Sequence, residues 1–414
     1  MRTTFWSFFW IQFLGSFVDN FIKSFLVVFV VYHSITLLGM DESKLVPFSG
    51  FLFVLPFFLF STHAGLIASK FQRKKLIQYV KFFELTLVIF ALISFLEQCW
   101  GCFFVIVFLQ GVQSTFFGPI KYSIIPDYVR AESLLQANGW VELGTFISIL
   151  LGTIMGTRSI AFIATIPWAF YLLLLVPSLL GFLLSFTLKE VPIENPHTKI
   201  NSRFLSSIFS EMKTFFHRKE IFSDIQAISF FWFNGMWILS LIPLLTKNVW
   251  QAPEALLTFF LSLFTIGIGL GSLLCYKIQS KITTTTYWTT FQLLFLSVLF
   301  FVLGFIVKLH KPYVTLQDWI TVPQHIIIMI CMFLFSFSMG LYIVPLYTSL
   351  QLDAPLMLRS KAIANNNIYN ALYMTLSSLT FIVLTKWLSY PYFFFCLGLI
   401  NLIFLFYLFP KKSY

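Results

Sequence analysis

Apolar residues fill this chain in long blocks, which are separated by short clusters of charged residues, proline and glycine. A helix needs about 20 apolar residues to cross the roughly 30 Å hydrocarbon core of a bilayer. The blocks reach that length, so the chain is predicted to be an all-α membrane protein with about twelve transmembrane helices. The predicted spans lie at residues 5–33, 46–69, 77–97, 101–125, 136–157, 162–188, 222–246, 256–276, 287–307, 323–349, 363–385 and 390–409.

The composition agrees with this pattern and excludes a soluble protein. Only 10% of the residues are charged and 58% are hydrophobic, whereas soluble domains carry about 25% charged residues. The chain also holds 55 phenylalanines, which insert favourably into bilayers and suit lipid-facing helices or an apolar cavity. Five cysteines among 414 residues do not indicate a disulfide framework.

The charge pattern orients the predicted helices. An even number of spans puts both termini on one side, and that side holds most of the 27 lysine and arginine residues, among them Lys70, Lys75 and Lys81. Because cytoplasmic loops carry the excess of basic residues, both termini are predicted to be cytoplasmic. This topology and the acidic headgroups of membrane lipids explain the net charge of +11, so we expect no nucleic-acid partner.

The longest polar stretch, residues 189–220, divides the chain into two predicted six-helix halves. A repeat supports the division, because Gly65 precedes Lys75 by ten residues and Gly271 precedes Lys281 by the same spacing. Parallel six-helix repeats are typical of major facilitator transporters. The predicted domains are an N-terminal six-helix bundle at 1–188, a cytoplasmic linker at 189–220 and a C-terminal six-helix bundle at 221–414.

The loop after the second predicted span carries a recognisable motif. Its sequence, residues 65–75, resembles the major facilitator signature Gly-x-Leu-Ala-Asp-Arg-x-Gly-Arg-Lys, with matches that include Gly65, Arg73 and Lys74. The aspartate position holds Ser69 instead, which argues against a charge-relay role for this loop. An ordinary basic cytoplasmic loop would produce a similar pattern through the positive-inside bias alone.

Ionisable residues inside the first span indicate a function. A charged side chain in mid-bilayer costs about 2.5–3.5 kcal/mol or more unless it is paired or hydrated. Asp19 and Lys23 stand four residues apart, so they share a helix face and are predicted to pair. We interpret Asp19, Asn20 and Lys23 as lining a hydrated central cavity, where they bind a polar headgroup or form a gate. The alternative is a self-neutralised pair that only makes the helix insertable.

The fourth and fifth spans carry further polar signals. Gly118-Pro119 is predicted to interrupt the fourth span, which is tolerated only against protein or a cavity. Lys121 follows near the cytoplasmic end, and Glu142 lies at a similar depth in the fifth span. An ion pair between them would remove both burial costs. Alternatively, Lys121 extends to the membrane interface as a boundary residue.

These segments, together with others in the second half, resemble the bacterial lysophospholipid transporter family of the major facilitator superfamily. The resemblance is dense in the first half and looser between about residues 190 and 330. The matching segments are residues 15–23, 114–126, 138–153, 344–346, 350–351, 359–360 and 363–367.

The resemblance implies a transporter and not an enzyme, with no cofactor. Such proteins move lysophosphatidylethanolamine and related lysophospholipids from the outer to the inner leaflet of the bacterial inner membrane by alternating access. The implied partners are the lysophospholipid substrate, membrane lipids and a cytoplasmic acyltransferase that restores the second acyl chain. The chain contains no His-x-x-x-x-Asp acyltransferase motif, so we expect that enzyme to be a separate protein.

Other chemistry has little support in the sequence. The six histidines are scattered without metal-ligand spacing, and no glycine-rich phosphate loop is present. Cys99 and Cys102 form a C-x-x-C pattern on a predicted outer loop without the βαβ context of a redox enzyme. The alternative function is a proton-coupled major facilitator transporter of a small solute or drug. Many of those carry an arginine where the fourth span here has Ile106, so we expect transport without proton symport.

Overall fold

The computed structural model describes residues 3–32, 36–37, 42–200, 210–252, 254–279, 285–308 and 318–412. Residues 201–209 of the predicted linker and Lys281 of the predicted repeat lie outside these ranges. Within them, eleven helices are long and apolar enough to cross a membrane, and a shorter apolar helix covers Tyr392–Leu408. The prediction of an all-α fold with about twelve membrane helices is confirmed.

The helices follow the apolar blocks but extend beyond several of them, because polar residues at the membrane boundary continue the helical hydrogen bonding. In chain order the first helices are α1 (Thr3–Tyr32), α2 (Glu42–Lys70), α3 (Arg73–Leu96), α4 (Trp100–Ser123), the short α5 (Ile125–Tyr128), α6 (Leu134–Thr165) and α7 (Pro167–Ser185). They are followed by α9 (Lys219–Leu244), α10 (Glu254–Gln279), α11 (Thr285–Lys308), the short α12 (Asp318–Thr321), α13 (Pro323–Asp353), α14 (Arg359–Leu384) and α15 (Tyr392–Lys412).

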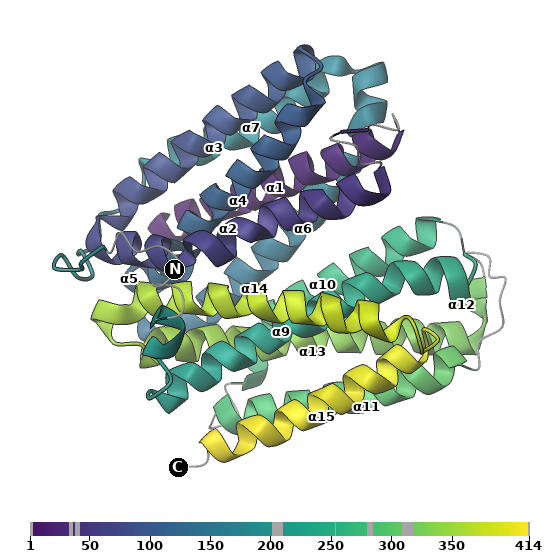
Figure 1. Ribbon diagram of the computed structural model, residues 1–414. Coiled ribbons are helices and arrows are strands. Elements are labelled where there is room, and N and C mark those ends of the chain that lie inside the picture. The colour runs from purple at the N-terminus through teal and green to yellow at the C-terminus, as the bar shows by residue number, and fades with distance from the viewer. Residues whose placement is uncertain are drawn as a thin grey trace. The chain divides into compact units, whose positions relative to one another are not determined.

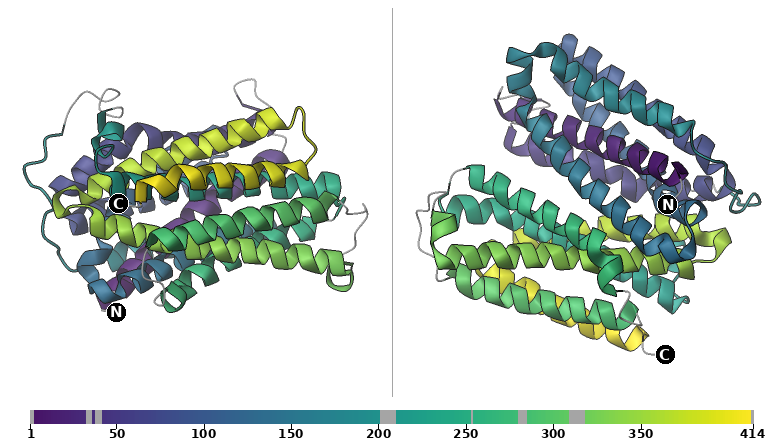
Figure 2. Two further views of the ribbon diagram at one scale, coloured as in Figure 1. Left: turned by 90° about the horizontal axis from the view of Figure 1, so that it is seen from below. Right: turned by 180° about the vertical axis from the view of Figure 1, so that it is seen from behind.

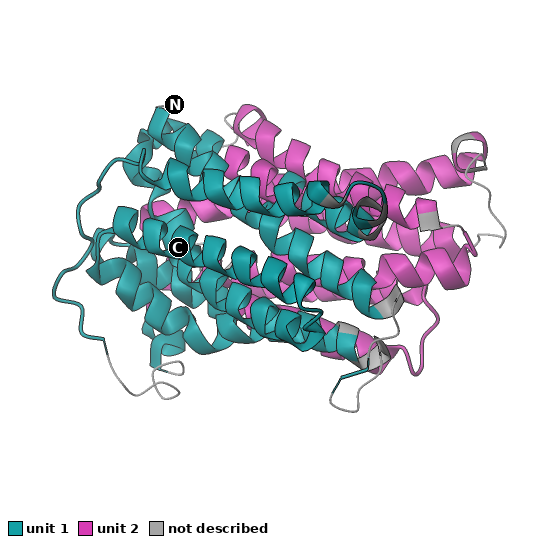
Figure 3. Ribbon diagram, turned by 90° about the horizontal axis from the view of Figure 1, so that it is seen from above, with its two compact units in different colours: residues 1–137, 147–214, 354–368 teal, residues 138–146, 215–353, 369–414 magenta. Residues whose placement is uncertain are grey.

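The chain forms two compact units that are not contiguous in sequence (Figure 3). Unit 1 comprises Met1–Ala137, Ile147–Thr214 and Ala354–Ile368, and unit 2 comprises Asn138–Phe146, Phe215–Asp353 and Tyr369–Tyr414. Helices α6 and α14 therefore each contribute residues to both units. The predicted division into an N-terminal bundle at 1–188 and a C-terminal bundle at 221–414 rests on the sequence repeat and stays a prediction.

Unit 1 is a bundle of long helices around an aromatic core. Helix α1 packs against α7, α2 against α4, and α3 against both α4 and α7, as Figures 1 and 2 show. The ring of Phe25 lies 5.0 Å from that of Phe170 and 5.4 Å from that of Phe103, measured between centroids. Phenylalanine thus fills the interior of this unit.

Unit 2 has the same all-helical construction. Helix α10 packs against α13, α11 against α13 and α15, and α9 against α13 and α15 (Figure 2). The stretch of α6 that belongs to this unit carries Asn138, which exchanges two side-chain hydrogen bonds with Gln351 of α13, at 2.7 and 3.0 Å. Thr348 of α13 accepts a further bond from the same amide at 3.0 Å. These three amide contacts fix the α6 stretch in unit 2.

Candidate functional site

A buried polar cluster surrounds Asp19 inside unit 1. Asp19 lies on α1 and is 8% exposed. Two side chains of α4 donate hydrogen bonds to its carboxylate: Ser114 Oγ to Oδ2 at 2.6 Å and Gln110 Nε2 to Oδ1 at 3.4 Å. Donors directed at a buried carboxylate offset much of the cost of removing it from water. The Ser114 and Gln110 side chains of α4 therefore stabilise the buried Asp19 carboxylate.

Helix α3 extends this cluster with an ion pair. Lys81 Nζ lies 2.7 Å from Glu84 Oε2, and the two side chains are only 1% and 2% exposed. Gln113 Nε2 donates to the same Glu84 oxygen at 2.9 Å, and Ser114 Oγ lies 3.2 Å from Gln113 Oε1. Polar contacts thus connect Lys81 through Glu84 and Gln113 to Ser114, whose single hydroxyl proton is shared between Gln113 Oε1 and the shorter bond to Asp19.

The apolar pattern does not predict this pair. The charge pattern counts Lys81 with the cytoplasmic residues, whereas the structure buries its side chain within the apolar helix Arg73–Leu96. Its ammonium lies beside Gly15 of α1, where an added side chain would collide with it. The spacing Lys-x-x-Glu within an apolar helix was the available signal, because residues three apart share a helix face.

Asp19 and Lys23 do not form the ion pair that their spacing predicts. Among the described residues, the ion pairs within 4.0 Å do not include one between them. Lys23 Nζ instead lies over the ring of Phe53 on α2, 3.7 Å from its centroid. The donors on α4 compete successfully for Asp19, and Lys23 gains a cation–π contact. Asn20 donates to the backbone oxygen of Ser16 at 2.7 Å.

Gly118 and Pro119 do not interrupt the fourth span, contrary to the prediction. Helix α4 continues through both residues to Ser123. Proline removes a single helical N–H donor, and a packed transmembrane helix tolerates this loss. Gly118 has a packing role, because a side chain there would collide with the amide of Asn367 in the α14 part of unit 1.

Lys121 and Glu142 belong to different units. Lys121 occupies the last turn of α4 in unit 1, is partly buried, and has its ammonium 5.0 Å from the centroid of the Tyr122 ring. A cation suits that position because the helix C-terminus carries partial negative charge. Glu142 lies buried in the α6 stretch of unit 2. Their pairing stays a prediction.

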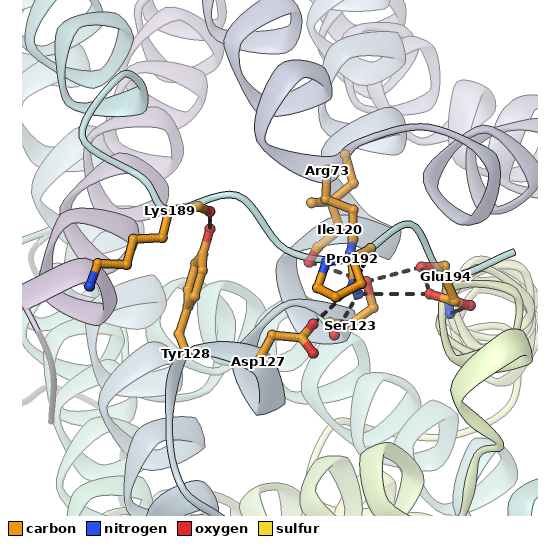
Figure 4. Close-up of polar contacts among 9 residues, drawn as sticks. Arg73, Ile120, Ser123, Asp127, Tyr128, Lys189, Pro192 and Glu194 are labelled. Carbon is orange, nitrogen blue, oxygen red and sulfur yellow. Dashed lines mark hydrogen bonds and ion pairs between the residues drawn. The ribbon is translucent and has the colours of Figure 1, made fainter. Parts of the chain in front are cut away.

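A second polar cluster in unit 1 is centred on Arg73 (Figure 4). The Arg73 side chain is 2% exposed, and its Nη2 lies 2.8 Å from Asp127 Oδ2. The guanidinium also donates to the backbone oxygens of Ser123 at 3.0 Å and Pro192 at 3.3 Å. The loop is therefore no ordinary solvated basic loop. Its Arg73 is a buried centre that joins α3, α4 and the segment after α7.

The other motif residues surround this centre. Gly65, near the end of α2, packs so closely against Ala364 that a side chain would collide with it. Lys74 lies next to Arg73 in the first turn of α3 and is partly buried. Gly65 thus permits the close approach of residues 354–368 to α2 within unit 1.

The first part of the predicted linker, residues 189–198, is docked onto this centre, and we call it the linker strap. Asn195 N donates to the backbone oxygen of Ser69 at 2.9 Å, and the Thr198 and Ser69 hydroxyl oxygens lie 3.3 Å apart. Tyr128 OH donates to the backbone oxygen of Lys189 at 3.1 Å (Figure 4). Four points of contact, including Pro192, hold the strap in place.

The strap carries one buried carboxylate, Glu194, which sequence reasoning did not identify. It accepts hydrogen bonds from Ser360 N at 2.9 Å and from Ser360 Oγ at 2.6 Å, and lies 3.8 Å from Arg73 Nη1. Burial raises the pKa of the Glu194 carboxyl above its ordinary value, while the Ser360 bonds and the charges of Arg73 and Arg359 act in the opposite direction.

Metal-binding chemistry has no visible basis in the described ranges. There, no three His, Cys, Asp or Glu side chains are grouped closely enough to hold a metal ion. The acidic residues of both clusters are instead matched with lysine, arginine, hydroxyl and amide donors. The two clusters are thus suited to binding charged organic groups or to holding helices together.

The chain is similar to curated lysophospholipid transporters over part of its length. The lysophospholipid transporter LplT of Photorhabdus laumondii is 29% identical over 111 residues, which are 27% of this chain and 26% of that protein. LplT of Klebsiella pneumoniae is 23% identical over 230 residues, which are 53% of this chain and 54% of that protein. The chain thus matches about a quarter to a half of the length of these relatives.

Solved structures of transporters share the fold over the whole chain. The human organic anion transporter MFSD10 superposes with a TM-score of 0.72 at 14% identity, covering 98% of this chain and 100% of its own. The transporter FucP in the outward conformation has a TM-score of 0.74 at 12% identity, covering 100% and 99%. In addition, the family model of the Major Facilitator Superfamily matches residues 8–378. This chain is a multi-pass membrane protein that belongs to the Major Facilitator Superfamily.

Proposed function

We propose that this transporter moves lysophospholipids such as lysophosphatidylethanolamine from the outer to the inner leaflet of the bacterial inner membrane by alternating access. A separate cytoplasmic acyltransferase then restores the second acyl chain. The buried Asp19 cluster carries the proposal, because Asp19 and its donor Ser114 lie in segments 15–23 and 114–126, which resemble the lysophospholipid transporter family. The curated relatives named lysophospholipid transporters support the same substrate class.

The chemistry of the cluster suits a zwitterionic headgroup. Lysophosphatidylethanolamine carries a phosphate and an ammonium group on one short headgroup. Asp19 offers a carboxylate, and Lys23, one helical turn further along α1, offers an ammonium. The Phe53 ring that holds Lys23 is a weak partner compared with a phosphate, so the lysine can exchange it for the lipid.

The proposed orientation places both termini in the cytoplasm. The positive-inside bias then puts the turn between α3 and α4 on the outer side of the membrane. Cys99 in that turn forms a disulfide with Cys102 in the first turn of α4. Disulfides persist in oxidising compartments such as the periplasm and are rare in the cytosol. The disulfide therefore supports the orientation on grounds independent of the basic residues.

Uptake of labelled lysophosphatidylethanolamine into vesicles that contain only this protein tests the function. We expect uptake above that of protein-free vesicles, and little change when an ionophore collapses the proton gradient. Absence of uptake would contradict the proposed substrate. Strong inhibition by the ionophore would favour the proton-coupled alternative.

A second cation extends the route. We propose that the phosphate passes from Lys23 toward Lys121 while the acyl chain stays in hydrocarbon, and that Glu142 holds Lys121 when no lipid is bound. Lys121→Ala should then lower initial uptake of every phosphate-bearing lysolipid about tenfold, because the inner phosphate anchor is lost. Lys121→Arg should be milder since it keeps the charge.

The measurement compares initial uptake rates of lysolipids with different headgroups across Lys121→Ala, Lys121→Arg and Glu142→Gln. Lys277, which lies in the last turn of α10 beside the ring of Tyr276, provides a matched control as Lys277→Ala. Uptake at the parental rate by Lys121→Ala would assign Lys121 to the membrane boundary and remove it from the route.

A further inference from the structure

Residues 359–368 at the start of α14 are held in unit 1, while the rest of the helix belongs to unit 2. The first N–H groups of a helix have no acceptor within the helix and carry partial positive charge. Here Glu194 satisfies one of them, because its carboxylate accepts from both Ser360 N and Ser360 Oγ. A carboxylate distant in sequence, on the linker strap, thus caps this helix.

The loop signature would supply an aspartate at the position of Ser69, and this chain instead carries a buried carboxylate on the linker strap, Glu194. The loop of this chain has Ser69 there, which is neutral and fully buried, and whose hydroxyl lies against Thr198 of the strap. The negative charge beside Arg73 comes from Asp127 on α5 and from Glu194. The charge that the loop lacks is therefore present, but it is carried by the linker.

We propose that Glu194 is a latch through which the linker strap holds residues 359–368 against Arg73 and Ser123 within unit 1, and that this latch opens and closes during the transport cycle. This rests on the proposed function for its alternating access. The strap is anchored through Lys189, Pro192, Asn195 and Thr198. The linker strap is therefore anchored in unit 1 and positions Glu194 for the latch.

Opening of the latch breaks the hydrogen bonds of Glu194 to Ser360 and exposes Ser123. When residues 359–368 leave unit 1, Glu194 loses two hydrogen bonds and keeps its attraction to Arg73. Ser123, whose hydroxyl lies 3.0 Å from that of Ser360 and which is fully buried, then becomes accessible. Accessibility of position 123 thus reports the state of the latch.

The test is the rate at which a membrane-permeant maleimide labels Ser123→Cys in a background without the five natural cysteines. We expect Glu194→Ala to label about tenfold faster than the parent, because a charged acceptor with two hydrogen bonds is lost. Glu194→Gln keeps polar atoms but loses the charge and should be intermediate. Equal rates for Glu194→Ala and the parent would overturn the latch.

The strap offers a matched control. Glu190 is an exposed carboxylate four residues earlier, with a single long contact, 3.5 Å, to Gln72. Glu190→Ala should label at the parental rate, and a gain equal to that of Glu194→Ala would reduce the effect to general loosening of the strap. Each variant must remain monodisperse in detergent, which separates latch release from misfolding.

A rescue tests the assignment of the charge. Ser69→Asp placed in the Glu194→Ala protein restores a carboxylate at the signature position and should return labelling toward the parental rate. No recovery would contradict the inference that Glu194 replaces the loop aspartate. The labelling requires no lipid, so it tests the latch independently of the uptake assay, whose failure in the parent would instead contradict the proposed substrate.

Discussion

Asp19→Ala is expected to lower lysophospholipid uptake about 10- to 100-fold while the protein still inserts and remains monodisperse. The variant removes the acceptor of the buried Gln110 amide, at a cost of about 1–3 kcal/mol, while Ser114 can still donate to Gln113 Oε1. It also removes the carboxylate proposed to bind the ammonium of the headgroup. Each 1.4 kcal/mol of lost binding corresponds to a factor of ten.

Two comparisons separate these effects. Asp19→Asn keeps the side-chain shape and one acceptor oxygen but replaces the other by an NH2 donor, so a loss equal to that of alanine would assign the role to the charged carboxylate. Asp353→Ala removes an exposed carboxylate at the end of α13 that accepts from Ser349 at 2.9 Å, and should leave uptake unchanged. An active Asp19→Ala protein would remove Asp19 from the transport site.

The largest expected effect on stability comes from breaking the Lys81–Glu84 pair. Glu84→Leu leaves the Lys81 ammonium buried at 1% exposure without its partner, which costs about 3–5 kcal/mol of unfolding free energy in comparable buried pairs. Lys81→Met/Glu84→Leu replaces both charges by apolar side chains and should recover most of that loss. Denaturant or thermal unfolding in detergent measures both variants.

The double variant also tests the chain to Asp19. If Glu84 positions Gln113 and Ser114 for Asp19, the double variant should regain stability without regaining the parental uptake rate. Equal stability of the single and double variants would show that Lys81 finds water when Glu84 is removed. That result would mean that Lys81 and Glu84 are hydrated in the protein in detergent.

The fold could be predicted because membrane helices leave long apolar runs in the sequence. The position of Asp19 within the first apolar helix followed from the same runs, but its partners did not. A spacing of four residues permits an Asp19–Lys23 pair and does not require it. The donors Ser114 and Gln110 decide the outcome, and they lie 95 and 91 residues away in the chain.

The second cluster shows the same limit more strongly. Gly65 and Arg73 could be identified because the loop signature is local. Glu194 could not, because its partner Ser360 is 166 residues away and no spacing rule marks a glutamate in a polar linker. The absence of an aspartate at the Ser69 position is evident from the sequence, but a substitute carboxylate from elsewhere in the chain is visible only in three dimensions.

The interleaved composition of the two units has a consequence for biosynthesis. Unit 1 is complete only when Ala354–Ile368 has been synthesised, roughly 150 residues after Thr214, or about 10–30 s at usual translation rates. During that interval the nascent first half lacks the segment that covers Ser123 and Gly65 and that binds Glu194. The membrane insertion machinery must accommodate this incomplete bundle. A ribosome stalled within α13 would expose the same surface.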